Sequence, residues 1–420
     1  MTAGGDGTWD SIPAMAAAAA GRFGDRPAIV DGDTRLTYAE LAAEARAFGA
    51  ALVASGIEAG DRVAIWAPNS AGWVVAALGL SQAGAVLVPV NTRFKGREAT
   101  DILSRSRARV LVTVTDFLGT DYVAMLDAAR AELDDLRTIV VERGPARPGT
   151  EPWDGFMARG TDEAQAEVDR RLAALGADDP ADILFTSGTT GLPKGVVQTH
   201  GRTLRVATDW AAMTGLGTAD RYLMVNPYFH MFGLKAGILA SVAAGATMLP
   251  EPVFDVDRVL ARVAEEAVTV LPGPPTLYQS ILDHPARDRH DLSSLRVAVT
   301  GAADIPVELV RRIDDELPFS TIITGYGLTE AGTATATSPS DDVETIATTV
   351  GRPRPGFELR IADDKGHDVP AGEPGEVVLR GGSIMAHYLD DPRATAEALS
   401  PDGWLRTGDL GVLDDHGCLR

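Results

Sequence analysis

The residues best suited to chemistry lie in one segment rich in glycine and hydroxyl groups, Thr186-Ser-Gly-Thr-Thr-Gly-Leu-Pro-Lys-Gly195. It follows a short apolar run at 183–185, the pattern of a strand. Glycines let the backbone approach an anion closely, and successive N–H groups can then surround phosphate oxygens. Lys194, one of four lysines in the chain, adds a mobile positive charge. The segment predicts a phosphate-binding loop; the alternative is a glycine-rich turn without a ligand.

The neighbours of Lys194 distinguish this segment from the P-loop of kinases. A P-loop has glycine directly before its lysine and serine or threonine directly after it. Here these positions hold Pro193 and Gly195. A P-loop kinase is therefore disfavoured.

The composition of the chain limits the classes of partner and the cellular compartment that we expect for it. Acidic residues outnumber basic ones by 59 to 38 over 420 residues, so we expect no nucleic-acid partner. The densest basic stretch, 104–109, is typical of a surface where a helix leads into a strand. The most apolar window, 72–90, is interrupted by polar residues and glycines, which favours a buried helix and strand over membrane insertion. The single cysteine, Cys418, permits no intrachain disulfide and suits a cytoplasmic location.

The chain around the loop alternates between helical and strand patterns. Helical periodicity covers 38–55 and 70–82, and runs typical of strands lie at 62–67, 85–90, 109–114, 137–141, 183–185, 247–249, 268–271, 297–300 and 321–324. This alternation predicts an α/β fold with doubly wound, mostly parallel sheets. From 350 to 380 the pattern changes to short glycine-rich strands, which predicts a small antiparallel barrel or meander.

These patterns divide the chain into three expected parts. We predict a first αβ subdomain over 1–175, a second αβ subdomain with the phosphate loop over 176–338, and a small barrel-like β subdomain over 339–420. The polar stretch 176–182 marks the first boundary.

The loop segment resembles the phosphate loop of the adenylate-forming superfamily, which contains acyl-CoA ligases, aryl-CoA ligases, luciferases and peptide-synthetase adenylation domains. Further segments match the family's motifs in order, namely Asn226–Gly233, Tyr326–Glu330, Val350–Gly356, Gly375–Val377 and Gly403–Asp409. The resemblance extends from about residue 36 to the last residue. It implies the fold of the large N-terminal domain of these enzymes.

The resemblance implies a nucleotide site that can be assigned residue by residue. Thr186 and Glu330 match the residues that hold Mg²⁺ on ATP, and oxygen ligands suit this hard cation. Thr329 matches the contact to the α-phosphate, and Asp409 matches the ribose-binding carboxylate. The remaining expected nucleotide-binding residues are Ser187, Gly188, Thr189, Thr190, Gly191 and Lys194 in the loop, and Gly301, Ala302, Ala303, Gly325, Tyr326 and Gly327 around the adenine. Taken singly, Glu330 could be a helix N-terminal carboxylate and Asp409 a turn residue.

The resemblance also implies an acyl pocket. His230 matches the active-site histidine near the acyl carboxylate and joins Lys194, Thr329 and Glu330 as expected catalytic residues; a core histidine is the alternative. The pocket is expected from His230, Phe232, Lys235, Pro275, Thr276, Gly301, Gly327 and Gly332. No Asp or Glu occurs in 228–241, where peptide-synthetase domains place an aspartate, so an α-amino acid is disfavoured. Lys235 either extends to the surface or meets a polar group of the substrate.

The implied reaction uses ATP, Mg²⁺ and coenzyme A. A small carboxylic acid attacks ATP to give acyl-AMP and pyrophosphate, and a thiol then displaces AMP. The chain is most similar to actinobacterial ligases for sterol-derived ring propionates, which favours a bulky hydrophobic acid. The alternatives are an aryl acid, transfer to a carrier protein, or a nucleotide-binding module without catalysis. The oligomeric state stays open, with a dimer among the options.

In this family a hinge and a small C-terminal lid domain carry a further catalytic lysine. By position they would follow Arg420, and the sequence does not say whether such a truncation is engineered or natural. The resemblance therefore implies that these 420 residues bind nucleotide and acid but adenylate slowly.

Overall fold

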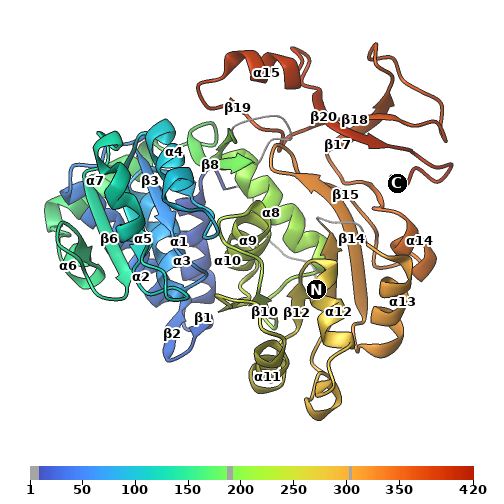
Figure 1. Cartoon of the computed structure of the whole chain (residues 1–420), viewed down its shortest axis with the longest axis horizontal. Coiled ribbons are helices and arrows are strands. Elements are labelled where there is room, and N and C mark those ends of the chain that lie inside the picture. The colour runs from blue at the N-terminus through green and yellow to red at the C-terminus, as the bar shows by residue number, and fades with distance from the viewer. Residues whose placement is uncertain (1–8, 187–192, 302–304) are drawn as a thin grey trace. The chain divides into compact units, whose positions relative to one another are not determined.

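The computed structural model describes residues 9–186, 193–301 and 305–420, and these form two compact units (Figure 1). The first unit extends to Ala207 and includes Tyr228–His230; the second contains Thr208–Pro227 and Met231–Arg420. Each unit is described by itself. Over these described ranges, no helix is both long and apolar enough to cross a membrane.

A mostly parallel sheet forms the centre of the first unit, with the strand order β9-β8-β4-β3-β5-β6-β7. Its strands are β3 (Arg62–Trp66), β4 (Val86–Pro89), β5 (Ala108–Val114), β6 (Thr138–Arg143), β7 (Glu151–Pro152), β8 (Pro180–Thr186) and β9 (Lys194–Thr199). All neighbours are parallel except β8 and β9, which form an antiparallel pair. The strand residues are mostly buried, as expected for a sheet covered on both faces.

Helices cover this sheet, and β1 (Pro27–Asp31) pairs antiparallel with β2 (Thr34–Thr37). The helices are α1 (Ile12–Phe23), α2 (Tyr38–Ala54), α3 (Ala71–Gln82), α4 (Gly96–Ser106), α5 (Tyr122–Leu126), the 3-10 turn η1 (Asp127–Glu132), α6 (Trp153–Met157) and α7 (Asp162–Ala174). Thr37 and Glu40 form a capping box at the start of α2, and Ser70 caps α3 by accepting from the Trp73 amide at 3.0 Å. Helix α8 (His200–Thr214) begins in the first unit and ends in the second.

The second unit contains a sheet with the order β16-β15-β14-β13-β12-β10-β11. Its strands are β10 (Arg221–Met224), β11 (Thr247–Pro250), β12 (Val270–Pro272), β13 (Val297–Gly301), β14 (Thr321–Leu328), β15 (Gly332–Ala336) and β16 (Arg352–Pro353). The strands from β11 to β14 are parallel, and β15 and β16 continue the sheet antiparallel. The carboxyl end of β14 therefore leads directly into a hairpin.

Helices and a smaller sheet complete the second unit. The helices are α9 (Met231–Gly233), the π-helix η2 (Leu234–Leu239), α10 (Ala240–Ala244), α11 (Val256–Glu266), α12 (Pro275–Leu282), the 3-10 turn η3 (Arg287–Arg289), α13 (Val307–Glu316), α14 (Val343–Thr348) and α15 (Pro392–Ala398). The small sheet has the order β17-β18-β20, with β17 (Phe357–Ala362), β18 (Gly375–Gly381) and β20 (Leu405–Gly411). A two-residue strand, β19 (His387–Tyr388), lies between β18 and α15 in the chain.

The predicted α/β class is confirmed, and the predicted helices and strands of the first unit closely match α2, α3 and β3 to β6. The strands β10, β1 and β2 are not among those predicted from the sequence. The predicted barrel-like part is, within the described residues, an open antiparallel meander of β17, β18 and β20. The division at 175 and 338 stays a prediction.

Candidate active site

The predicted phosphate loop connects the two strands of the β8–β9 hairpin. Residues 187–192, which include the predicted site residues Ser187, Gly188, Thr189, Thr190 and Gly191, lie outside the described ranges. The hairpin register pairs Thr186 with Lys194, and both residues are half-buried. Side chains directly opposite each other in an antiparallel pair extend to the same face. A hydroxyl and an ammonium group that were predicted to contact phosphate are thus neighbours across one turn of the chain.

Arg105 on α4 connects both ends of this hairpin. Its guanidinium lies 5.2 Å from the ring centroid of Phe185, and its Nη1 donates to the carbonyl of Pro193 at 2.7 Å. An ion pair with Asp101 at 3.2 Å holds the arginine on its own helix. Phe185 directly precedes Thr186, and Pro193 directly precedes Lys194. Arg105 therefore fixes the backbone on both sides of the predicted loop, a role that its place in a basic stretch does not indicate.

The second group of predicted residues lies at the β14–β15 hairpin. Tyr326 and Gly327 belong to β14, Thr329 and Glu330 form the turn, and Gly332 begins β15. Gly332 has a φ of +82°, a conformation that favours glycine. A Cβ on Gly327 would lie 2.3 Å from the Gly332 carbonyl oxygen, so this position also excludes a side chain. The glycines of the motif are needed to build the turn that presents Glu330.

The structure brings Tyr326 and Asp409 together although 83 residues separate them in the chain. The Tyr326 hydroxyl donates to Asp409 Oδ2 at 2.6 Å, and Asp409 lies exposed on β20. Burial, and secondarily the nearby carboxylates, raise the pKa of the Tyr326 phenol, so the hydroxyl keeps its proton at neutral pH. Two residues expected at adenine and at ribose thus form one hydrogen-bonded pair.

Glu330 has a different kind of partner. Its Oε1 accepts a hydrogen bond of 2.9 Å from the hydroxyl of Tyr388, and its carbonyl accepts one of 2.6 Å from the Met385 amide. Within the described part of the chain, no basic side chain forms an ion pair with Glu330. The carboxylate therefore has further lone pairs available for a hard cation. The residues fit the predicted role of Glu330 toward Mg²⁺, and neither Tyr388 nor Met385 carries a sequence signal for this contact.

The glycines predicted at the adenine are also neighbours. Gly301 at the end of β13 pairs with Gly325 in β14, and a Cβ on Gly301 would lie 3.0 Å from the Gly325 carbonyl oxygen. Small residues here are thus explained by the approach of the two strands, and the adenine slot stays a prediction. Ala302 and Ala303 lie outside the described residues.

His230 lies in the first unit, and the other predicted acyl-pocket residues lie in the second. The residue is exposed, which disfavours the alternative of a core histidine, and its role at the acyl carboxylate stays a prediction. Desolvation by the surrounding protein atoms nonetheless lowers its pKa, which favours the neutral imidazole. Among the other candidates, the Phe232 ring packs edge-on against Trp210 with centroids 5.0 Å apart, Pro275 begins α12, and Thr276 is exposed.

Lys235 is almost fully buried, with 1% of its surface exposed. This burial excludes the alternative that its amine extends to the surface. The residue lies in the π-helix Leu234–Leu239, where all six residues are buried. π-helical turns are rare and frequently occur at functional sites. A buried lysine amine in such a segment supports the view that Lys235 meets a polar group.

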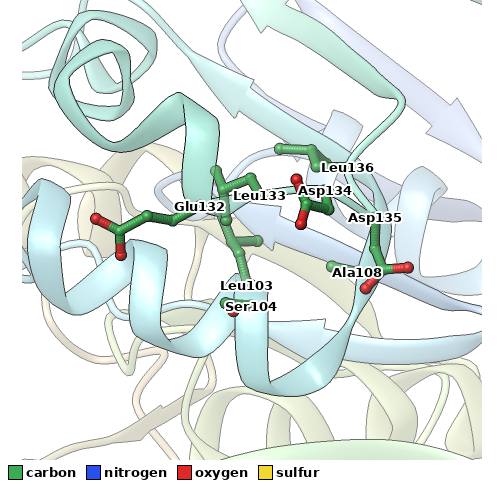
Figure 2. A pocket seen from close by; sticks show the side chains of 8 residues that line it. All are labelled: Leu103, Ser104, Ala108, Glu132, Leu133, Asp134, Asp135 and Leu136. Atoms are coloured by element: carbon green, nitrogen blue, oxygen red, sulfur yellow. The ribbon is translucent and has the colours of Figure 1, made fainter.

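A small hollow on the first unit contains none of the predicted site residues (Figure 2). It has a volume of about 80 Å³ and lies between α4, the end of η1 and the segment before β6. Its lining residues are Leu103, Ser104, Ala108, Glu132, Leu133, Asp134, Asp135 and Leu136. Three carboxylates repel a phosphate, so this hollow is not a nucleotide site.

Comparison with known proteins gives the class. The family of AMP-binding enzymes matches residues 16–389. The chain is 47% identical to a 3-[(3aS,4S,7aS)-7a-methyl-1,5-dioxo-octahydro-1H-inden-4-yl]propanoyl:CoA ligase of Rhodococcus jostii (strain RHA1), over 97% of this chain and 78% of that protein. It is 49% identical to a ligase of the same name from Mycobacterium tuberculosis, over 98% of this chain and 78% of that protein. The chain therefore belongs to the AMP-binding enzyme family.

Solved structures agree with this assignment. The anthranilate CoA ligase AuaEII, in complex with anthranoyl-AMP, superposes with a TM-score of 0.88 at 27% identity, over 100% of this chain and 79% of that one. The N-terminal domain of FACL13 from Mycobacterium tuberculosis superposes with a TM-score of 0.85 at 31% identity, over 98% of each chain. The expected fold of an adenylate-forming N-terminal domain is confirmed.

Proposed function

We propose that this chain is an AMP-forming acid–CoA ligase for a bulky alicyclic carboxylic acid. The observation that carries the proposal is the identity of 47% and 49%, over nearly the whole chain, to two ligases named for a ring-bearing propanoyl group. A medium-chain acyl-CoA ligase at 32% identity and a feruloyl-CoA synthase at 35% share the thioester-forming chemistry with other acyl groups. Family membership supports acid activation, and the closer similarity supports a ring-bearing acid.

The proposed nucleotide contacts come from both hairpins. Lys194 and Thr186 bind phosphate oxygens, Thr329 contacts the α-phosphate, and Asp409 binds the ribose hydroxyls beside Tyr326. Glu330 and Thr186 would supply oxygen ligands to Mg²⁺, which would neutralise charge on the phosphates. An acid oxygen bonds to the α-phosphorus while the bond to pyrophosphate breaks, and a CoA thiolate then bonds to the acyl carbon while AMP leaves. The protein aligns anions that otherwise repel each other.

The proposed acid site is apolar with one buried amine. The segment from Tyr228 to Ser241 contains no carboxylate and includes the buried π-helix. An apolar ring system suits these surroundings, and the Lys235 amine offers a hydrogen bond to a ring ketone or hydroxyl. We assign Lys235 to recognition of an oxygen on the ring system.

Lys235→Met tests this role, because methionine keeps an unbranched side chain of similar length and removes the amine. We expect the preference for a keto-bearing ring acid over its hydrocarbon analogue to fall about tenfold or more, as when a site loses a polar contact to its substrate. ATP affinity stays at the wild-type value. Competition between the two acids in pyrophosphate exchange gives this preference directly, and an unchanged preference would assign Lys235 a structural role.

The function itself is tested with a panel of acids. ATP–pyrophosphate exchange is measured with alicyclic ring propionates, aryl acids, fatty acids and α-amino acids, and coenzyme A or a carrier protein is added afterwards. We expect the ring propionates to give the highest exchange and coenzyme A to release AMP. The carrier protein as acceptor is the second candidate, and AMP release with it alone would replace the first. A cytoplasmic location is part of the proposal, supported by the lone cysteine.

A further inference from the structure

Tyr388 lies outside every motif of the predicted site, yet it contacts a residue at its centre. Its hydroxyl donates to Glu330 Oε1 at 2.9 Å across 58 residues of chain. Only 7% of the Tyr388 surface is exposed, whereas Glu330 is half-buried. A hydrogen bond to a charged acceptor is stronger than one between neutral groups.

The segment that leads to Tyr388 also holds the backbone around Glu330. The Met385 amide donates to the Glu330 carbonyl at 2.6 Å, and the Ser383 hydroxyl donates to the Ala331 carbonyl at 2.8 Å. Three hydrogen bonds from residues 383–388 thus hold two consecutive residues of the β14–β15 turn. Both the position of the turn and the direction of its carboxylate depend on this segment.

Tyr388 is itself anchored to α15. Its amide donates to Thr395 Oγ1 at 3.0 Å, and the Thr395 hydroxyl donates to the Asp391 carbonyl at 2.8 Å. Asp391 caps the helix by accepting from the Ala394 amide at 2.8 Å. The phenol is therefore held from the helix side before it meets Glu330.

The donor is neutral, which matters for the chemistry of Glu330. The Tyr388 phenol donates to the Glu330 carboxylate without carrying a charge of its own. An arginine or lysine at this place would compete electrostatically with a bound cation. A phenol orients one carboxylate oxygen without cancelling its charge, and the remaining lone pairs stay available.

We propose that Tyr388 is a positioning residue for Glu330, fixing the carboxylate in the orientation that receives the magnesium ion of bound ATP. This inference rests on the proposed function, in which Glu330 is a Mg²⁺ ligand. Tyr388 does not touch the nucleotide in this role; it acts through Glu330.

The test measures binding of ATP rather than turnover. ATP binding to the 420-residue chain is followed by calorimetry over a range of Mg²⁺ concentrations. For Tyr388→Phe we expect the Mg²⁺ concentration for half-maximal ATP affinity to rise about three- to tenfold, the range expected for losing one ordinary intramolecular hydrogen bond. Thermal unfolding of the ligand-free variant reports any general loss of stability. Tyr122→Phe is the matched control, because its hydroxyl donates to the Thr92 carbonyl at 2.8 Å and contacts no predicted site residue.

Two further proteins make each outcome decisive. Glu330→Gln should lose the Mg²⁺ dependence, and the double variant with Tyr388→Phe should be no weaker than Glu330→Gln alone. If Tyr388→Phe has the Mg²⁺ requirement of Tyr122→Phe while the wild type binds normally, the inference is wrong and the proposed function stands. If Glu330→Gln keeps the wild-type requirement, Glu330 is not a ligand and the inference is overturned. If the wild type binds no ATP at any Mg²⁺ concentration, the proposed function fails as well.

Discussion

The two regions expected to hold ATP are built in different ways. In the first unit, Thr186 and Lys194 face each other across one hairpin, so the pairing of β8 with β9 brings them together. In the second unit, Tyr326 bonds Asp409 across 83 residues of chain, and Glu330 bonds Tyr388 across 58. The placement of Thr186 beside Lys194 depends only on the register of one hairpin. The contacts of the second region form only when the large sheet, the small sheet and the segment 383–388 are all folded.

This difference predicts how each region responds to mutation. A change at the hairpin removes one contact to the ligand and leaves the others in place. A change in the second region also disturbs the partner of the lost group, because Tyr326 and Asp409 share a hydrogen bond. The effects of neighbouring substitutions there should not be additive.

The largest expected effect is at Lys194. We expect Lys194→Ala to lower the rate of ATP–pyrophosphate exchange about a hundredfold, as for loss of one group that stabilises charge in the transition state. Lys365→Ala is the matched control, since Lys365 is exposed on the second unit, and its exchange rate should equal the wild-type rate. If Lys194→Ala exchanges pyrophosphate at the wild-type rate, the β8–β9 hairpin does not contribute to the ATP site. The comparison of two ATP-binding regions would then fail.

The same contrast explains what the sequence could reveal. The hairpin was predictable because its chemistry lies in ten consecutive residues after an apolar run. Tyr326, Glu330 and Asp409 were found through separate motifs, but their contacts depend on the fold. Arg105 and Tyr388 have no such signal: their partners lie 88 and 58 residues away, and an isolated arginine or tyrosine is common in any chain. The sequence also does not predict the burial of Lys235, because the exposure of side chains along a π-helix does not repeat with a simple period.

A smaller effect is expected for the Tyr326–Asp409 pair. Asp409→Asn should weaken ATP binding about tenfold, and Tyr326→Phe somewhat less, because each loses a hydrogen bond that involves a charged group. Since the two groups bond each other at 2.6 Å, the double variant should be weaker than wild type by less than the product of the single effects. Calorimetry on all four proteins closes this cycle. If the loss of ATP affinity in the double variant equals the product of the two single losses, Tyr326 and Asp409 act independently. The second region would then respond to mutation in the same way as the first.

The smallest expected effect tests whether ATP binding by the β8–β9 hairpin depends only on contacts within the hairpin. Arg105→Ala removes one hydrogen bond and one ring contact from the backbone on either side of residues 187–192 and should weaken ATP binding about fivefold. Arg105→Lys should recover only part of this loss, because an ammonium group lacks the planar surface that lies over Phe185. Arg97→Ala on the same helix is the control, since Arg97 is exposed and pairs only with Glu132 among the described residues. If Arg105→Ala unfolds at a lower temperature but binds ATP as well as Arg97→Ala does, the hairpin needs nothing beyond its own strands. If ATP binding weakens while the unfolding temperature holds, the first region also depends on a contact distant in the chain, and the two regions differ only in degree.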